Sequence, residues 1–456
     1  MDRLEDFEQT NVALCQEKAL VKKLDRRIIP YVCVLYTLCF LDRVNIGHAR
    51  LYNIEKDLNL DQDQYSWALS VFFIGYILFE VPSNLLLKRF SPPRWIARIM
   101  VSWGIVTLAM AAVTDFKGIL VARFFLGAAE AGLFPGIIFF LSFWFTRQEQ
   151  GIRIALLSAS SQLAGAFGGL IAYSVKALEG RWGLKGWQWL FFVEGVVTVV
   201  MGIITWWALP ATPNDAPWLS SDERHLLRQR LQSSHVDLDI GRFRMQEFIS
   251  AFTDYKTYLY VMIFVGLECP LYAMMLLMPT IVNSFGFSTF NSMLLSSPPN
   301  LFALVMTLAV AWNSDRVLER GYHIMFSTGV AIAGFITLTL TQSIAIKYTA
   351  LILIMGGLAA SFPPNLSWSN NNMVGSTKAA TCSALIIALG NAGGFASAHL
   401  YRKEEAPDYT RSHLINTASL CVTLISVILL KVGLTYENHK RDKLNPAAAN
   451  TFRYIL

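Results

Sequence analysis

The clearest feature of this chain is a long apolar run, GILVARFFLGAAEAGLFPGIIFFLSFWF, at residues 118–145. Only two charged residues, Arg123 and Glu130, interrupt it. A helix needs about 20 mostly apolar residues to cross the hydrocarbon core of a bilayer, and this run is longer than that. The sequence therefore predicts a membrane-spanning helix here, with two ionisable groups inside it.

Similar runs recur along the whole chain, which has 456 residues, of which 54% are hydrophobic and 15% charged. This composition is too apolar for a water-soluble protein of this size. We predict an all-α polytopic membrane protein with twelve transmembrane helices in two halves of six. The expected ranges are 28–45, 66–87, 95–113, 118–145, 152–175 and 187–209, followed by 257–282, 293–312, 324–341, 348–368, 381–400 and 415–434.

The polar stretches between these runs suggest five parts. They are an N-terminal tail at 1–27, a six-helix bundle at 28–209, a linker at 210–256, a second bundle at 257–434 and a C-terminal tail at 435–456. In the linker, Ser220 and Glu223 form the pattern of a capping box, which predicts an amphipathic helix at the membrane surface. The loops at 88–94 and 314–321 are weakly similar, as expected for the repeated halves of many secondary transporters.

Lysine and arginine are concentrated in every second loop, which marks the cytosolic side of a membrane protein. The pattern places both tails and the linker in the cytosol, and we expect residence in the plasma membrane as a monomer. The net charge of +6 is modest, so nucleic acid is a poor candidate partner. The six cysteines and seven histidines form no zinc-binding or catalytic pattern. We therefore expect no metal, no cofactor and no enzyme activity.

Several motifs resemble those of a known family. They are FLDRVNIGHA at 40–49, FEVPSN at 79–84, RFFLGAAEAGLFPG at 123–136, GWQWLF at 186–191, GFSTFN at 286–291, APDY at 406–409 and YEN at 436–438. Together they resemble the anion:cation symporter family of the major facilitator superfamily, and within it the fungal branch of allantoate and nicotinate permeases. The loop after the second span departs from the Gly-x-x-x-Asp-Arg form that is usual in the superfamily.

The resemblance implies a proton-coupled symporter that imports a small organic anion by alternating access. The expected substrate is a carboxylate vitamin or nitrogen compound such as nicotinate or allantoate. Two alternatives stay open: an exporter or uniporter of a different organic anion or secondary metabolite, and a membrane nutrient sensor that binds its ligand without transporting it.

Charged residues inside the apolar runs are the first candidates for the site, because burying a charge in a membrane is costly. Arginine offers a planar fork to a carboxylate, so Arg43 and Arg123 are expected to bind the anion. Asp42 and Glu130 are expected to load and release the proton. The family resemblance implies the same four roles. The structural alternative is that Asp42 with Arg123, or Arg43 with Glu130, form static ion pairs.

Further candidates are polar residues of other spans. By matching to the family, Tyr76, Gln162 and Asn391 are expected to face the substrate, although each is equally suited to hydrogen-bonding between helices. Glu268 lies inside the seventh span and is a candidate for substrate specificity, or else a neutral acid bonded to a neighbouring helix. Asp315 and Arg316 are expected to form part of a gate, with a purely topological role as the alternative.

Overall fold

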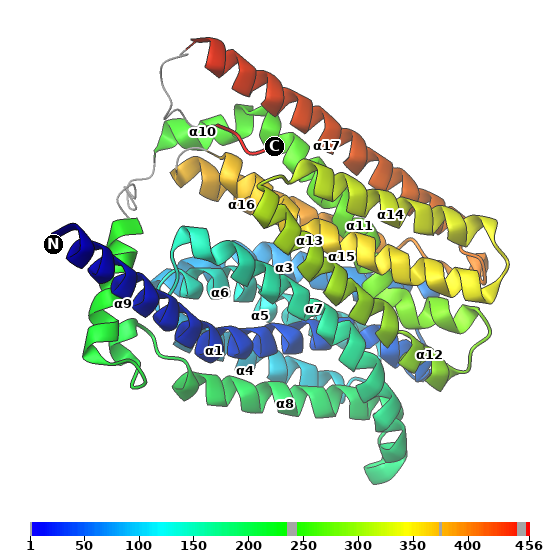
Figure 1. Ribbon diagram of the computed structural model, residues 1–456. Coiled ribbons are helices and arrows are strands. Elements are labelled where there is room, and N and C mark those ends of the chain that lie inside the picture. The colour runs from blue at the N-terminus through cyan, green and yellow to red at the C-terminus, as the bar shows by residue number, and fades with distance from the viewer. Residues whose placement is uncertain (1, 235–243, 374–375, 445–452) are drawn as a thin grey trace.

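The computed structural model describes residues 2–234, 244–373, 376–444 and 453–456. All regular structure in these residues is helical, and the long helices run lengthwise through the molecule (Figure 1). The first half contains α1 (Asp2–Leu51), α2 (Ile54–Asp57), α3 (Gln62–Arg89), α4 (Pro92–Met110), α5 (Phe116–Glu130), α6 (Leu133–Leu141), α7 (Arg147–Val175), the 3₁₀ turns η1 (Lys176–Leu178) and η2 (Arg181–Gly183), and α8 (Gly186–Ala208).

The linker and the second half are also built of α-helices and short 3₁₀ turns. The linker contains η3 (Pro213–Asp215), α9 (Ser221–Ser234) and α10 (Met245–Thr253). The second half contains α11 (Tyr255–Ser284), α12 (Thr289–Leu295), α13 (Ser297–Val317), α14 (Gly321–Leu340), α15 (Ile344–Asn372), α16 (Ser376–Ser397), η4 (Lys403–Glu405) and α17 (Thr410–Leu444).

Every predicted span coincides with a helix or a helix pair. Eleven helical segments of the described residues are long and apolar enough to cross a membrane. The remaining predicted span, at 95–113, corresponds to α4. This helix has 19 residues, including Arg94 and Arg98, and falls outside that group. It packs along α8. Their approach is close, because a Cβ at Gly195 would come 2.8 Å from the Leu108 backbone nitrogen.

Helix α1 begins at Asp2 and not near residue 28, where the first apolar run starts. Residues 2–29 contain neither glycine nor proline and are rich in leucine, glutamate and lysine. These residues have high helix propensity, so the helix continues well beyond the apolar run.

The run at 118–145 is divided into two helices. Helix α5 ends at Glu130, and α6 starts at Leu133 after Gly132, which has φ 88°. That left-handed conformation favours glycine, and the Ser83 side chain occupies the space that a Cβ of Gly132 would need. The break places the carboxyl group of Glu130 at the end of a helix inside the bundle.

The linker helix begins with the predicted capping box. The Ser220 hydroxyl accepts a hydrogen bond from the Glu223 amide (3.2 Å), and the Glu223 carboxylate accepts one from the Ser220 amide (2.8 Å). Glu223 also pairs with Lys23 of α1 (2.7 Å). Helix α9 therefore lies at the end of the bundle where α1 begins, on the left of Figure 1. We call this the linker end and the opposite end, near α12, the far end.

Residues 453–456 run across the linker end of the second half. Ile455 exchanges two hydrogen bonds of 2.8 Å with the Asn372 side chain, and its carbonyl also accepts one from the Trp368 indole (2.8 Å). The amide of Arg320 donates to the Leu456 carbonyl (2.7 Å). This short segment thereby connects the end of α15 with the start of α14.

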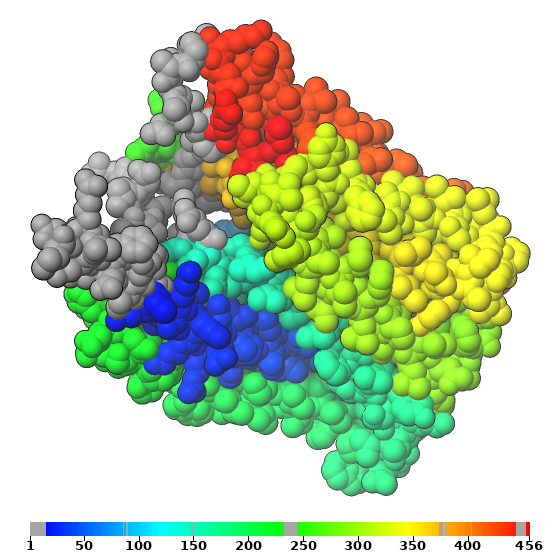
Figure 2. Space-filling view, in the orientation of Figure 1, coloured from blue at the N-terminus to red at the C-terminus, as the bar shows by residue number. Residues whose placement is uncertain are grey.

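The two halves occupy opposite sides of the molecule and meet along a seam between α7 and α13 (Figure 2). Near the far end, the Ser297 hydroxyl donates to the Ala166 carbonyl (2.6 Å). On the other flank, the Ser70 hydroxyl of α3 lies 2.9 Å from His399 Nε2, just beyond α16. Direct hydrogen bonds thus join the halves at the far end.

Candidate functional site

A cavity lies between the two halves, with walls from α1, α3, α5, α6, α7, α11, α15 and α16. It contains about 800 Å³ of space not occupied by protein atoms, its opening included. Much of the wall is aromatic, formed by Tyr36, Phe40, Tyr76, Phe134, Phe264, Tyr272 and Phe362.

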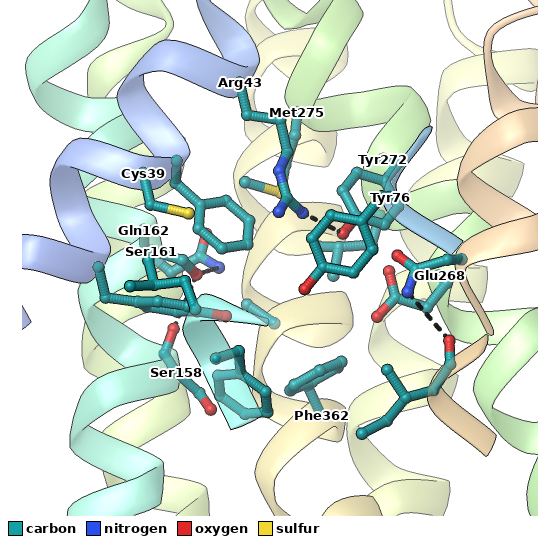
Figure 3. A pocket seen from close by; sticks show the side chains of 18 of the residues that line it. Cys39, Arg43, Tyr76, Ser158, Ser161, Gln162, Glu268, Tyr272, Met275 and Phe362 are labelled. Atoms are coloured by element: carbon teal, nitrogen blue, oxygen red, sulfur yellow. Dashed lines mark hydrogen bonds between the residues drawn. The ribbon is translucent and has the colours of Figure 1, made fainter. Parts of the chain in front are cut away.

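The guanidinium group of Arg43 projects into this cavity (Figure 3). Its Nε donates to Glu130 Oε1 (2.9 Å), and Nη2 contacts the same oxygen. Its Nη1 donates to the Tyr272 hydroxyl of α11 (2.7 Å). Arg43 is 4% exposed, and its guanidinium carbon lies 4.5 Å from the centre of the Phe40 ring. Arg43, which belongs to the first half, is therefore hydrogen-bonded to a residue of each half.

Glu130 is the acceptor in this arrangement and is fully buried in the protein. Its Oε1 also accepts a hydrogen bond from the Cys39 thiol (2.9 Å), while its Oε2 has no hydrogen-bond partner. The Arg43–Glu130 ion pair considered from the sequence is thus present. Because both residues line the cavity, a ligand in it would reach both members of the pair.

Asp42 and Arg123 lie outside the cavity lining. Asp42 Oδ2 accepts hydrogen bonds from Trp103 Nε1 (2.9 Å) and Thr198 Oγ1 (2.8 Å), both within the first half. Arg123 donates to the carbonyls of Ala68 (3.2 Å) and Arg43 (3.4 Å). Successive helical residues point about 100° apart, which directs Asp42 away from the space that Arg43 enters. Arg123 lies about 10 Å from Glu130 along α5, at about 1.5 Å per residue, and so misses the cavity.

Tyr76, Gln162 and Asn391 all line the cavity. Gln162 Nε2 donates to Ser161 Oγ (3.3 Å), but Gln162 Oε1 has no partner. Asn391 donates to the carbonyl of Ile387 one turn earlier on α16 (3.0 Å). Gln162 thus retains an unused hydrogen-bonding group, and Asn391 uses its donor within its own helix.

Glu268 also lines the cavity, from α11. It is 5% exposed, and its Oε2 has no hydrogen-bond partner. Among the lining residues that the structure describes, Arg43 is the one cation, and Glu130 and Glu268 are the two acidic residues.

Our sequence reasoning missed Tyr272, which accepts the hydrogen bond from Arg43, and also Cys39, Ser158 and Ser161. Helical spacing offers a signal for two of these four residues. Tyr272 is four residues after Glu268 on α11, and Ser158 is four residues before Gln162 on α7, so each pair shares a helix face.

The predicted gate residues lie at the linker end, away from the cavity. Asp315 pairs with Arg320 (2.5 Å), and the Arg316 guanidinium lies 5.5 Å from the centre of the Trp312 ring. Asp315 Oδ2 is 3.9 Å from the position that a Cβ of Gly151 would take, at the start of α7. Asp315 of the second half is therefore close to a helix of the first half.

Comparisons with known proteins agree with this architecture. The chain is 35% identical to the MFS transporter prlL of Fungal sp. (strain NRRL 50135) over 93% of its own length and 88% of that protein. It is 33% identical to a protein of Agrobacterium vitis named for tartrate transport, over 91% and 92%. Its fold is similar to the crystal structure of a bacterial homolog of the human lysosomal transporter Spinster, with TM-score 0.65, 14% identity and coverage of 89% and 96%.

The sequence profile of the Major Facilitator Superfamily matches residues 32–398. This range runs from the first apolar run to the end of α16 and includes all the lining residues of the cavity. The chain is a multi-pass integral membrane protein and belongs to the major facilitator superfamily of transporters.

Proposed function

We propose that this protein is a proton-coupled symporter that imports a small organic anion, a carboxylate vitamin or nitrogen compound such as nicotinate or allantoate. The observation that carries the proposal is the Arg43 guanidinium in the cavity, bonded to Glu130 and to Tyr272. A planar cation of this kind binds a carboxylate through two parallel hydrogen bonds. The Agrobacterium vitis relative named for tartrate transport adds support for a carboxylate substrate.

The geometry suggests how binding couples to a proton. Glu130 holds two of the nitrogen donors of Arg43, so a substrate carboxylate competes with Glu130 for the same fork. A carboxylate that loses a neighbouring cation in a buried site favours its protonated form. Substrate binding and protonation of Glu130 therefore stabilise each other, which is the linkage that symport requires.

The orientation of the chain decides which compartment the cavity faces in this state, and an inward proton gradient would drive import. The concentration of lysine and arginine in alternate loops supports a cytosolic linker end, and the proposal includes residence in the plasma membrane. The hydrogen bonds between α7 and α13 and between α3 and the end of α16 close the far end, so this state would face the cytosol. In the proposal, Asp315 and Arg316 stabilise the opposite state at the linker end, Asp42 and Arg123 support the site from outside the cavity, and the transporter acts as a monomer.

Uptake into vesicles tests the proposal. Purified protein in proteoliposomes should accumulate labelled nicotinate or allantoate when the outside is more acidic, and a protonophore should abolish the accumulation. Glu130→Gln should lose accumulation but keep exchange of substrate across the membrane, and Arg43→Gln should lose both. Glu179→Gln, an exposed loop carboxyl, is the matched control.

Other results would contradict proton coupling or indicate a uniporter or a sensor. Accumulation that survives the protonophore or Glu130→Gln would overturn proton coupling. Movement only down the substrate gradient would indicate a uniporter. Binding without any flux would indicate a sensor.

A further inference from the structure

The charges of the cavity wall are unbalanced. Arg43 supplies one positive charge, and Glu130 occupies it as an ion-pair partner. Glu268 is a second acidic residue on the same wall and is 5% exposed, with Oε2 lacking any hydrogen-bond partner. A buried carboxyl group without a partner is costly, because it has lost its hydration and gained nothing in return. Glu268 therefore has an unused capacity to bind a ligand group.

Glu268 is well placed to act together with Arg43. It lies one helical turn before Tyr272, whose hydroxyl accepts the hydrogen bond from Arg43 Nη1. Arg43 and Glu268 thus approach the same space from different halves (Figure 3). The position facing Glu268 on α16 is Gly393, and a Cβ there would lie 3.3 Å from Glu268 Cβ. Gly393 thus lets α16 pack closely against α11 at Glu268.

We propose that the substrate carries a cationic nitrogen besides its carboxylate, and that Glu268 binds this nitrogen. This inference rests on the proposed function, in which Arg43 takes the carboxylate, but it replaces nicotinate and allantoate, whose nitrogens are uncharged at neutral pH, with a carboxylate that also carries a cationic nitrogen. In the proposed mechanism Glu130 is protonated when the substrate takes Arg43, so Arg43 and Glu268 then balance each other, and a simple monoanion would leave one unbalanced negative charge. A zwitterion adds no net charge, and its two ends match Arg43 and Glu268. The aromatic wall, including Tyr76 and Phe362, also suits a cation through its ring faces.

Two ligands of the same shape test the inference: 1-methylpyridinium-3-carboxylate and 3-methylbenzoate. They share the ring, the methyl group and the carboxylate, and differ by one permanent positive charge. Their dissociation constants are measured by titration calorimetry with the full chain in detergent. The wild type should bind the zwitterion at least about tenfold more tightly, a difference of about 1.4 kcal/mol.

Three variants separate the contributions. Glu268→Gln should abolish the preference for the zwitterion, because it weakens binding of the zwitterion and removes the repulsion of 3-methylbenzoate by the Glu268 carboxylate. Glu268→Leu should abolish the preference as well, and it serves as the second variant if the glutamine variant folds poorly. Glu194→Gln changes a buried carboxyl group of α8 that does not line the cavity, and it should keep the preference.

The outcomes distinguish the inference from the proposed function. Equal binding of the two ligands by the wild type, or a preference that survives both Glu268 variants, would overturn the role of Glu268 and leave carboxylate transport intact. If neither these ligands nor nicotinate, allantoate or tartrate bind, the proposed function itself fails. Loss of all carboxylate binding in Arg43→Gln supports the common anchor on which both rest.

Discussion

The hydrogen bond between Thr198 and Asp42 can be measured by removing the hydroxyl. Asp42 is 1% exposed, and its Oδ2 accepts from both Thr198 Oγ1 (2.8 Å) and Trp103 Nε1 (2.9 Å), while its Oδ1 has no partner. Thr198→Val keeps the shape of the side chain but removes one of these two donors. The neighbouring helices then hold a carboxylate with a single hydrogen bond.

The expected cost follows from the charge of the acceptor. Hydrogen bonds between helices of a membrane protein average about 0.6 kcal/mol, whereas hydrogen bonds to charged groups contribute about 1.5–3 kcal/mol. We expect Thr198→Val to lower the free energy of unfolding by about 1.5–3 kcal/mol. Asp42→Asn should reduce the effect of the same substitution to about 0.6 kcal/mol, because the acceptor is then neutral.

Equilibrium unfolding in mixed detergent micelles measures all four members of this cycle. The control is Thr107→Val, since Thr107 is buried in α4 but donates only to the Trp103 carbonyl of its own helix (3.1 Å). A loss for Thr198→Val no larger than that of the control would refute the reasoning. An equal loss of unfolding free energy for Thr198→Val in the wild type and in the Asp42→Asn background would also refute it.

Three other predictions concern packing, pH and the C-terminal segment. Gly169→Ala places a methyl group against the Met293 carbonyl, so it should lower the free energy of unfolding by about 1–3 kcal/mol. The control Gly329→Ala, whose Cβ would meet nothing within 4 Å, should not lower it. Equal melting temperatures for the two variants would contradict this prediction. Burial alone would raise the pKa of Asp254, but the hydrogen bond from Lys378 (2.5 Å) and other donors lower it. Its contribution to stability is therefore present above the unfolded pKa of about 3.9 and lost as the pH falls through the lower folded value. Melting curves of wild type and Asp254→Asn should converge in acid, and parallel curves would count against the assignment. Trp368→Phe removes the donor to Ile455 and should cost about 1 kcal/mol more in the full chain than in a chain without residues 453–456, because the loss of buried volume is common to both; the same cost in both would show that the hydrogen bond does not contribute.

The sequence was sufficient to predict the order of the long helices, because each predicted apolar run lies on a helix or a helix pair. Eleven segments of the described residues are long and apolar enough to cross a membrane, and α4 is the predicted span outside that group. The sequence was insufficient to predict where some helices begin, end or break. The break after Glu130 depends on the fit of Gly132 against Ser83 of α3, a contact between residues far apart in the chain. The early start of α1 depends on helix propensity beyond the membrane, which hydropathy does not report.

The candidate site was predictable where a residue's own helix decides its direction. Arg43, Glu130, Tyr76, Gln162, Asn391 and Glu268 all line the cavity. Arg123 does not line the cavity. It shares a face of α5 with Glu130 but lies about 10 Å from it along the helix axis, which places it beyond the cavity wall. Tyr272 was missed because its partner, Arg43, lies on the other half, and such pairings arise only when the halves assemble.

The bond between Arg43 and Tyr272 also sets a limit on how often the halves separate at the cavity. It is a hydrogen bond to a charged group, so breaking it costs about 1.5–3 kcal/mol. On that account alone, roughly 0.6 to 7 percent of molecules would have it broken at any moment. A ligand that occupies Arg43 removes this restraint, and the fraction of molecules free to change state then rises with ligand occupancy.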